Sequence, residues 1–221
     1  MKHKGKLVAL GNCFGAPAIY KDMFTVLVTV TNFKELSVIE KDDVVLYGGG
    51  EDISPSMYGE SFSRFSYADK MTRRDYLEQA AFRRALRKGA ANFGICRGAQ
   101  LVCALSGGKL VMHINGHTGG GHIIVDRDTK KKYVTSSVHH QMMWPFDMLQ
   151  SKFEVLAATE ENHSDVYAFN DKDVRFSIPY KEPEIVWFPE TKSLGIQGHP
   201  EFMNSTAPLI KYSKDLLAKY L

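Results

Sequence analysis

The stretch AANFGICRGAQLVCAL, residues 90–105, decides the fold class that this sequence predicts. Its first six residues, 90–95, are mostly apolar or small and predict a buried central strand. Residues 97–105 have the pattern of a helix, and the glycines at 107 and 108 end it. Cys96 therefore falls at the junction of a strand and the helix that follows. In an open α/β sheet, this junction is where binding and catalytic residues gather.

Glycines flank Cys96 in the pattern G-x-C-x-G, from Gly94 to Gly98. They allow the chain to turn sharply without Cβ clashes. Such a turn exposes the sulfur, places it at a helix N-terminus that favours thiolate, and offers the Arg97 backbone N–H to an oxyanion. A buried structural cysteine is the alternative, and it is our interpretation of Cys13 and Cys103. For Cys96, the pattern predicts a nucleophile.

Strands and helices alternate in the first part of the chain, whereas strands dominate the second part. Strands are expected at 6–10, 28–31, 44–47, 122–126, 132–136, 153–158, 166–170, 185–188 and 193–197. Helices are expected at 17–27, 69–88 and 205–221. These patterns predict an α/β fold: an open, mostly parallel sheet flanked by helices, with additional antiparallel strands in the second half.

The composition is that of an ordinary soluble globular protein. With 221 residues, 44% of them apolar, one domain spanning residues 1–221 is expected. The net charge of +3 is mild, which argues against nucleic acid as a partner. The three cysteines lack metal-type spacing and no signal peptide is recognisable, so we expect free thiols and a cytoplasmic location. The apolar runs are too short for a membrane role.

A base for Cys96 is expected from the segment Gly198-His199-Pro200-Glu201. A cysteine nucleophile needs a base near it and a third group that orients the base, and both can come from far along the chain. This segment follows the predicted strand at 193–197, so His199 should lie at a strand end. Glu201 is near enough in sequence to reach its imidazole. A lone histidine is usually a surface or core residue, but the paired carboxylate favours a functional role.

Two of these motifs together resemble the class I glutamine amidotransferase superfamily: GICRGAQ at 94–100 and GHPE at 198–201. Three further features are most similar to its γ-glutamyl hydrolase and γ-glutamyl-aminobutyrate hydrolase branch, which is peptidase C26-like. They are GGEDISPSMYGE at 49–60, the pair Arg74-Asp75, and SSVHHQ at 136–141. The resemblance covers about Val44 to Phe202 and implies the flavodoxin-like fold of that superfamily.

The resemblance also implies roles for individual residues. It implies a catalytic triad of Cys96 as nucleophile, His199 as base and then acid, and Glu201 as the orienting group. It implies an oxyanion hole from the backbone N–H groups of Gly50 and Arg97. It implies substrate binding by Gln100, Ser137 and His139. The sequence departs from the family pattern at Ala99, Ser136 and Gly198, which leaves the triad intact and the substrate open.

The function implied is that of a glutaminase-type enzyme, which cleaves a γ-glutamyl amide through a cysteine thioester and passes ammonia to a separate ATP-dependent synthetase. Two alternatives remain open at this point: a stand-alone hydrolase of a γ-glutamyl amine or peptide, and a non-catalytic binding or regulatory protein on the same fold. No cofactor is expected. The histidines at 113, 117, 122, 139 and 140 are possible ligands without clear spacing, so no metal is predicted either.

Overall fold

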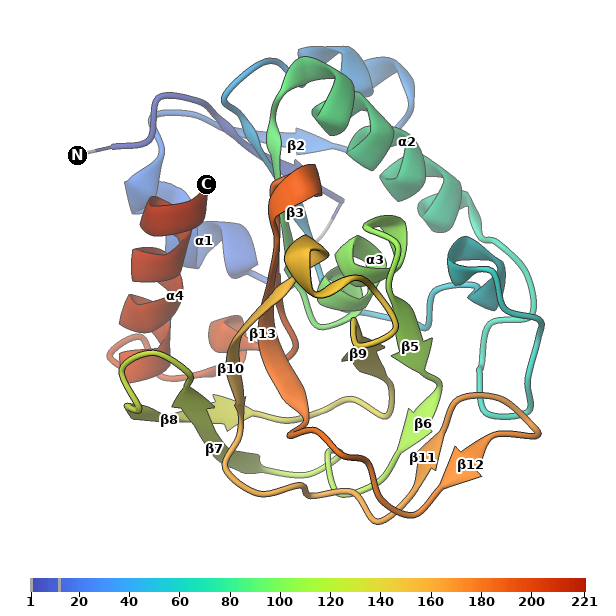
Figure 1. Ribbon diagram of the computed structural model, residues 1–221. Helices are drawn as coiled ribbons and strands as arrows, with labels where there is room; N and C mark the ends of the chain where they lie inside the picture. The colour runs from blue at the N-terminus through green and yellow to red at the C-terminus, as the bar shows by residue number, and fades with distance from the viewer. Residues whose placement is uncertain (1, 12) are drawn as a thin grey trace.

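A nine-stranded sheet forms the centre of the computed structural model, which describes residues 2–11 and 13–221 (Figure 1). The strand order is β2-β1-β3-β4-β14-β13-β10-β7-β8. The first five are parallel neighbours: β2 (Leu27–Val30), β1 (Leu7–Leu10), β3 (Val44–Tyr47), β4 (Ala91–Ile95) and β14 (Ser193–Ile196). The rest pair antiparallel: β13 (Pro183–Phe188), β10 (Glu154–Thr159), β7 (Gly121–Asp126) and β8 (Lys132–Ser136). This mixed α/β architecture confirms the predicted fold class.

Helices cover both faces of the parallel half of the sheet. Helices α2 (Arg73–Lys88) and α3 (Arg97–Leu105) pack on one face, and α1 (Ala16–Tyr20) and α4 (Pro208–Tyr220) on the other. Strand β1 shows why two faces are needed, because its side chains alternate and all are buried. Val8 and Leu10 join the hydrophobic cluster of α2 and α3, whereas Leu7 and Ala9 join that of α1 and α4.

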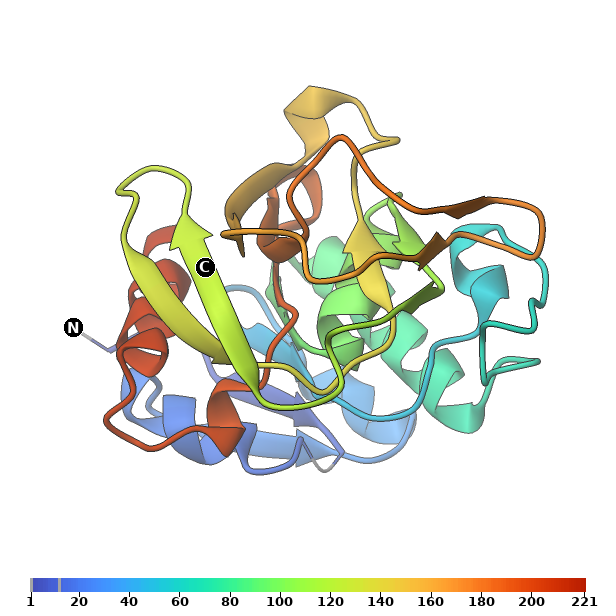
Figure 2. The ribbon, with the colours of Figure 1, turned by 90° about the horizontal axis from the view of Figure 1, so that it is seen from below.

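The second half of the chain adds short strands beside the main sheet and a β-hairpin at its edge. Two small sheets form, β5 (Lys109–Val111) with β9 (Met142–Trp144), and β6 (His113–Ile114) with β11 (Tyr167–Ala168) and β12 (Val174–Arg175). Of these strands, the sequence predicted only β11. Figure 2 shows the β7–β8 hairpin, in yellow-green, against helix α4, in red. There, Tyr133 stacks on Tyr212 with ring centroids 4.3 Å apart.

The helix predicted at 17–27 is wrong in its length. Helix α1 ends at Tyr20, and after the 3-10 turn η1 (Lys21–Met23) the chain is extended at Phe24. Phe24 is buried in the core. The predicted helix, which continued past Tyr20, did not account for this burial. The helix predicted from 69 begins instead at Arg73, because Thr72 and Asp75 form a capping box. The C-terminal helix begins at Pro208, a residue suited to the first helical position.

Three parallel strands in the middle of the sheet bring three loops together. Strands β3, β4 and β14 are consecutive neighbours, with Tyr47 opposite Gly94 and Ile95 opposite Ile196. Parallel neighbours end at the same edge of a sheet. The glycine loop after β3, Cys96 after β4 and His199 after β14 therefore gather at this edge. No helix in the described ranges is long and apolar enough to cross a membrane.

Candidate active site

Cys96 lies on the tight turn that the sequence predicts between β4 and α3. Its backbone has φ 51° and ψ −110°, a conformation that a residue with a side chain adopts only under constraint. The constraint is close packing, since a Cβ on Gly94 would lie 2.1 Å from the Gly98 carbonyl oxygen. A Cβ on Gly98 would in turn lie 2.1 Å from the Tyr47 carbonyl oxygen. Both glycines are therefore needed to place Cys96 at the N-terminus of α3.

His199 is held from three sides. Its Nδ1 and Glu201 Oε1 are 2.7 Å apart, and both side chains are buried. Its backbone N–H donates to Ser136 Oγ over 2.8 Å, and the Ser136 hydroxyl donates to the His199 carbonyl over 3.0 Å. The Phe202 ring stacks on the imidazole at 4.4 Å with an interplanar angle of 4°. These contacts fix both the position and the tilt of the ring.

The charge of His199 is set by the groups around it. Burial lowers the pKa of a histidine, but hydrogen bonds with Cys96 and Glu201 outweigh it and raise the pKa of His199 to about 9. This pKa favours the imidazolium form of His199 at neutral pH. Cysteine nucleophiles react as thiolates, a form that a neighbouring imidazolium favours. The structure thus brings Cys96, His199 and Glu201 together in series, and their catalytic roles stay predictions.

Arg74 of α2 orients the glycine loop that follows β3. Its Nη2 donates to the carbonyl oxygens of Gly48 and Gly49 over 3.0 and 2.9 Å. In a trans peptide, the carbonyl and the next N–H point in opposite directions, so the Gly50 N–H points away from Arg74. Gly50 has φ 141°, which only glycine adopts readily. The predicted oxyanion role of Gly50 thus depends on a backbone orientation that Arg74 fixes.

A buried ion-pair network, which the sequence did not reveal, ties Cys96 to this loop. Arg97 Nη2 is 2.5 Å from Asp75 Oδ1, and its Nη1 pairs with Glu78. Glu78 also accepts from Arg74 Nε over 2.8 Å. The buried charges are thus paired, as buried charges must be, and Arg74 also pairs with the exposed Glu51 over 2.9 Å. One sequence feature could have revealed part of this network: Arg74 and Glu78 are four residues apart, which places them on the same face of a helix.

The predicted substrate-binding residues lie close by but with their side chains engaged. Gln100 Nε2 donates to the Gln141 carbonyl over 3.0 Å. The Ser137 hydroxyl donates to the His117 carbonyl over 2.9 Å. His139 Nδ1 is 2.9 Å from the Gln141 carbonyl, and burial lowers the pKa of His139 to about 4. Three side-chain atoms of this segment have no partner among the described residues and stay available to a substrate: His139 Nε2, Gln141 Nε2 and Gln141 Oε1.

Solved structures of glutamine amidotransferases share this fold. A glutamine amidotransferase from Thermotoga maritima is 15% identical, with a TM-score of 0.59 over 98% of this chain and 85% of that chain. A glutamine amidotransferase from Methylobacillus flagellatus is 11% identical, with a TM-score of 0.54 over 92% and 72%. A chain of PurLQS from Thermotoga maritima is 12% identical, with a TM-score of 0.56 over 99% and 100%. At these identities, the similarity shows the fold: the protein has the architecture of the class I glutamine amidotransferases.

The family follows from the sequence match. Residues 24–155, more than half of the chain, match the family model described as Peptidase C26, and the chain belongs to this family. The resemblance predicted from residues 44–202 is therefore confirmed. The matched range includes Cys96 and ends before His199, so the second half of the candidate site depends on the geometry described above. A comparison with curated proteins finds no matching sequence.

Proposed function

We propose that this protein hydrolyses γ-glutamyl amides through a thioester on Cys96. The observation that carries this proposal is the series Cys96, His199 and Glu201 at the adjoining ends of β4 and β14, with 2.7 Å between His199 Nδ1 and Glu201 Oε1. Nucleophile, base and orienting carboxylate in hydrogen-bonded order are the requirement for acyl transfer. A non-catalytic protein on this fold would not need a strained cysteine paired with a histidine.

The reaction proceeds in two halves at the same three residues. The Cys96 thiolate attacks the γ-carbonyl carbon, and the backbone N–H groups of Gly50 and Arg97 stabilise the oxyanion. His199 gives its proton to the leaving nitrogen, so that the C–N bond breaks and ammonia or an amine departs. Water then attacks the thioester as His199 takes its proton, which releases glutamate and restores the thiolate. Every proton is returned, and the steps need no cofactor.

The fate of the released ammonia separates two forms of this proposal. The first form is a glutaminase that serves a separate synthetase, and the glutamine amidotransferase fold is compatible with it. Membership of the Peptidase C26 family and the segments at 49–60 and 136–141 support a stand-alone hydrolase of a γ-glutamyl amine or peptide. Ammonia or amine release by the purified chain alone, with and without a candidate synthetase, distinguishes them. Activity that rises only with the synthetase favours the first form.

The glutamyl half of the substrate is expected to be recognised strictly. We expect L-glutamine to be hydrolysed at least about 10⁴ times faster, as kcat/KM, than 4-aminobutanamide, which lacks the α-carboxylate. A site built to pair with a polar group rejects an analogue without it, because the polar groups of the protein are left unpaired. γ-Glutamylmethylamide, which changes only the leaving group, serves as the control and should still be cleaved. Comparable rates on L-glutamine and 4-aminobutanamide would refute glutamyl recognition.

Gly49 is expected to be essential for the position of His199. An alanine Cβ at Gly49 would lie 2.5 Å from His199 Cε1 and 3.2 Å from Nε2, so the Gly49→Ala change must displace the ring. A displacement of about 1 Å costs on the order of 10²-fold in rate, and we expect kcat/KM to fall by about that much. Gly119→Ala is the matched control, because its Cβ would meet nothing within 4 Å. Equal activities of the two variants would contradict this geometry.

A further inference from the structure

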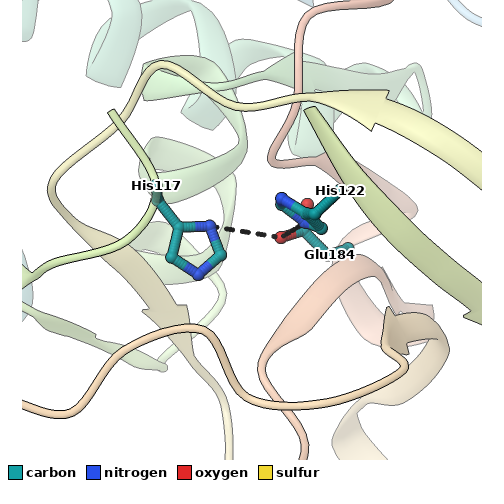
Figure 3. A group of neighbouring side chains, drawn as sticks. All are labelled: His117, His122 and Glu184. Atoms are coloured by element: carbon teal, nitrogen blue, oxygen red, sulfur yellow. Dashed lines mark hydrogen bonds and ion pairs between the residues drawn. The ribbon is translucent and has the colours of Figure 1, made fainter. Parts of the chain in front are cut away.

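A buried cluster of histidine and glutamate side chains lies outside the Cys96 site, where β7 and β13 meet the loop before β7. Glu184 Oε1 is 2.9 Å from His122 Nε2 and 3.9 Å from His117 Nδ1. The three residues each offer one ligand atom, and these atoms all lie within 4.8 Å of one another. Figure 3 shows both imidazoles beside the Glu184 carboxylate. All three side chains are at least nine-tenths buried.

The sheet brings these residues together because β10 ends between β7 and β13. Its last residue, Thr159, pairs with Ile124 of β7 and donates to the Glu182 carbonyl of the chain leading into β13. His122 points to the same face as Ile124, two residues further toward the start of β7. Beyond the end of β10, the side chains of His122 and Glu184 meet directly. Sixty-two residues separate the two in sequence, so no local motif could reveal the pair.

Glu182 fixes the tautomer of His117. Its carboxylate accepts hydrogen bonds from the backbone N–H groups of His163 and Ser164, from the Tyr167 hydroxyl and from His117 Nε2. The two backbone N–H groups and the hydroxyl do not depend on the tautomer of His117, and three such donors favour the ionised carboxylate. An ionised carboxylate only accepts, so His117 Nε2 carries the proton. His117 Nδ1 then carries the lone pair, and it lies 3.1 Å from Ser137 Oγ and 3.9 Å from Glu184 Oε1.

Several buried polar atoms of the cluster lack hydrogen-bond partners among the described residues: His122 Nδ1, His139 Nε2 and Glu184 Oε2. Glu184 Oε2 belongs to the carboxylate whose Oε1 faces His122, so a bound cation would pair with it, whereas His122 Nδ1 is the ring nitrogen on the side away from Glu184. Two further imidazoles border the three ligands. The His139 ring lies 4.7 Å from that of His117, and the exposed His163 ring lies 4.7 Å from that of His122.

We propose that His117, His122 and Glu184 bind one divalent metal ion of the zinc type. Two imidazole nitrogens and a carboxylate oxygen are a ligand set that zinc prefers. Zinc bonds of about 2.0–2.2 Å place tetrahedral ligand atoms roughly 3.3–3.6 Å apart. Two of the three ligand pairs, at 2.9 and 3.9 Å, bracket this range, and all three pairs lie within 4.8 Å. The His117 contact with Glu182 supplies the carboxylate behind a ligating histidine that orients such ligands.

The role of this metal is structural. The His117 carbonyl accepts from the Ser137 hydroxyl and from the His139 N–H, so an ion on His117 would anchor residues 137–139 to β7 and β13. The neighbouring Ser136 holds the backbone of His199. The ion would thus stiffen the segment beside the candidate active site without taking part in its chemistry. This proposal revises the sequence-based expectation of no metal.

Zinc binding to the purified, chelator-treated chain tests the proposal. After zinc chloride is added and excess removed, we expect about one zinc per chain by elemental mass spectrometry. Glu184→Gln and His122→Gln should lose it. His140→Gln is the matched control, because His140 pairs with Asp52 over 2.9 Å in a histidine–carboxylate pair outside the cluster. Cys96→Ala should also keep its zinc. Zinc lost with Cys96→Ala but kept in Glu184→Gln would overturn the proposal.

Thermal unfolding gives a second readout. Zinc at a free concentration about 100 times its Kd should raise the Tm of the unsubstituted chain by roughly 5–10 °C. The Glu184→Gln chain should show no shift. Because the unsubstituted chain is measured directly, a variant that fails to fold does not prevent the test. An unsubstituted chain that binds no zinc and keeps the same Tm would show that the cluster is a metal-free hydrogen-bond network.

Discussion

Replacement of Cys96 by alanine is expected to abolish hydrolysis of L-glutamine, with kcat lowered by on the order of 10⁶-fold. The change removes the sulfur that would form the thioester, and no other thiol can take its place. The fold should remain, since the alanine Cβ occupies the place of the cysteine Cβ in the turn between β4 and α3. Ammonia release measures the loss, and circular dichroism melting shows that the variant is folded.

The control for this experiment is Cys103→Ala, one of the two cysteines interpreted as structural. Cys103 is fully buried in α3, and burial raises the pKa of its thiol to about 12, so it stays neutral and unreactive. Its variant should keep activity within a few-fold. A glutamine-analogue electrophile should add to Cys96 alone, as peptide mass spectrometry would show. Turnover retained in Cys96→Ala, or a label on another residue, would reject the proposed mechanism.

The second large effect is expected from His199→Ala, with kcat reduced by about as much as on loss of the nucleophile. In the proposed mechanism, the imidazole activates Cys96 and protonates the leaving nitrogen, so its loss removes both functions. Glu201→Gln should cost less, on the order of 10⁴-fold, because an orienting group tunes the base and does not itself move the proton. Rates on L-glutamine, measured for both variants at matched pH, give the comparison.

The Glu201→Gln variant is designed to keep the orientation of the His199 ring. In Glu201→Gln, the amide retains an oxygen that can accept from His199 Nδ1, which is 2.7 Å from Glu201 Oε1. The ring therefore keeps its orientation while losing a charge that raises the pKa of His199. Equal and negligible losses in His199→Ala and Glu201→Gln would mean that the base lies elsewhere in the chain.

Local sequence signals predicted the elements that carry the site. Residues 44–47 and 97–105 form the predicted strand and helix with the predicted bounds, since buried apolar runs and glycine stops act within a few residues. The error at 17–27 has a different origin. The periodicity there suits a helix, but burial of Phe24 in the core overrides it. Tertiary contacts also create β5, β6 and β9, whose two or three residues are too short for a periodic signal.

The buried charge networks show the limit of sequence reasoning most clearly. Arg97 was predicted for its backbone N–H, yet its side chain joins Asp75 and Glu78 of α2. Ser137 and His139 are predicted to face a substrate, and the structure adds that both side chains also bond to backbone carbonyls in the interior. Side-chain direction depends on neighbours from other elements, and these neighbours are known only once the sheet order is known.

The sequence by itself determined the α/β class, the turn that presents Cys96 and the family. These properties depend on periodicity, glycine positions and short motifs, all of which act over neighbouring residues. Only the tertiary structure decided that β14 lies beside β4, which brings His199 to Cys96, and that β10 ends early enough for His122 to reach Glu184. The physical reason is that strand order and register are set by burial of the whole sheet, which couples residues far apart in the chain.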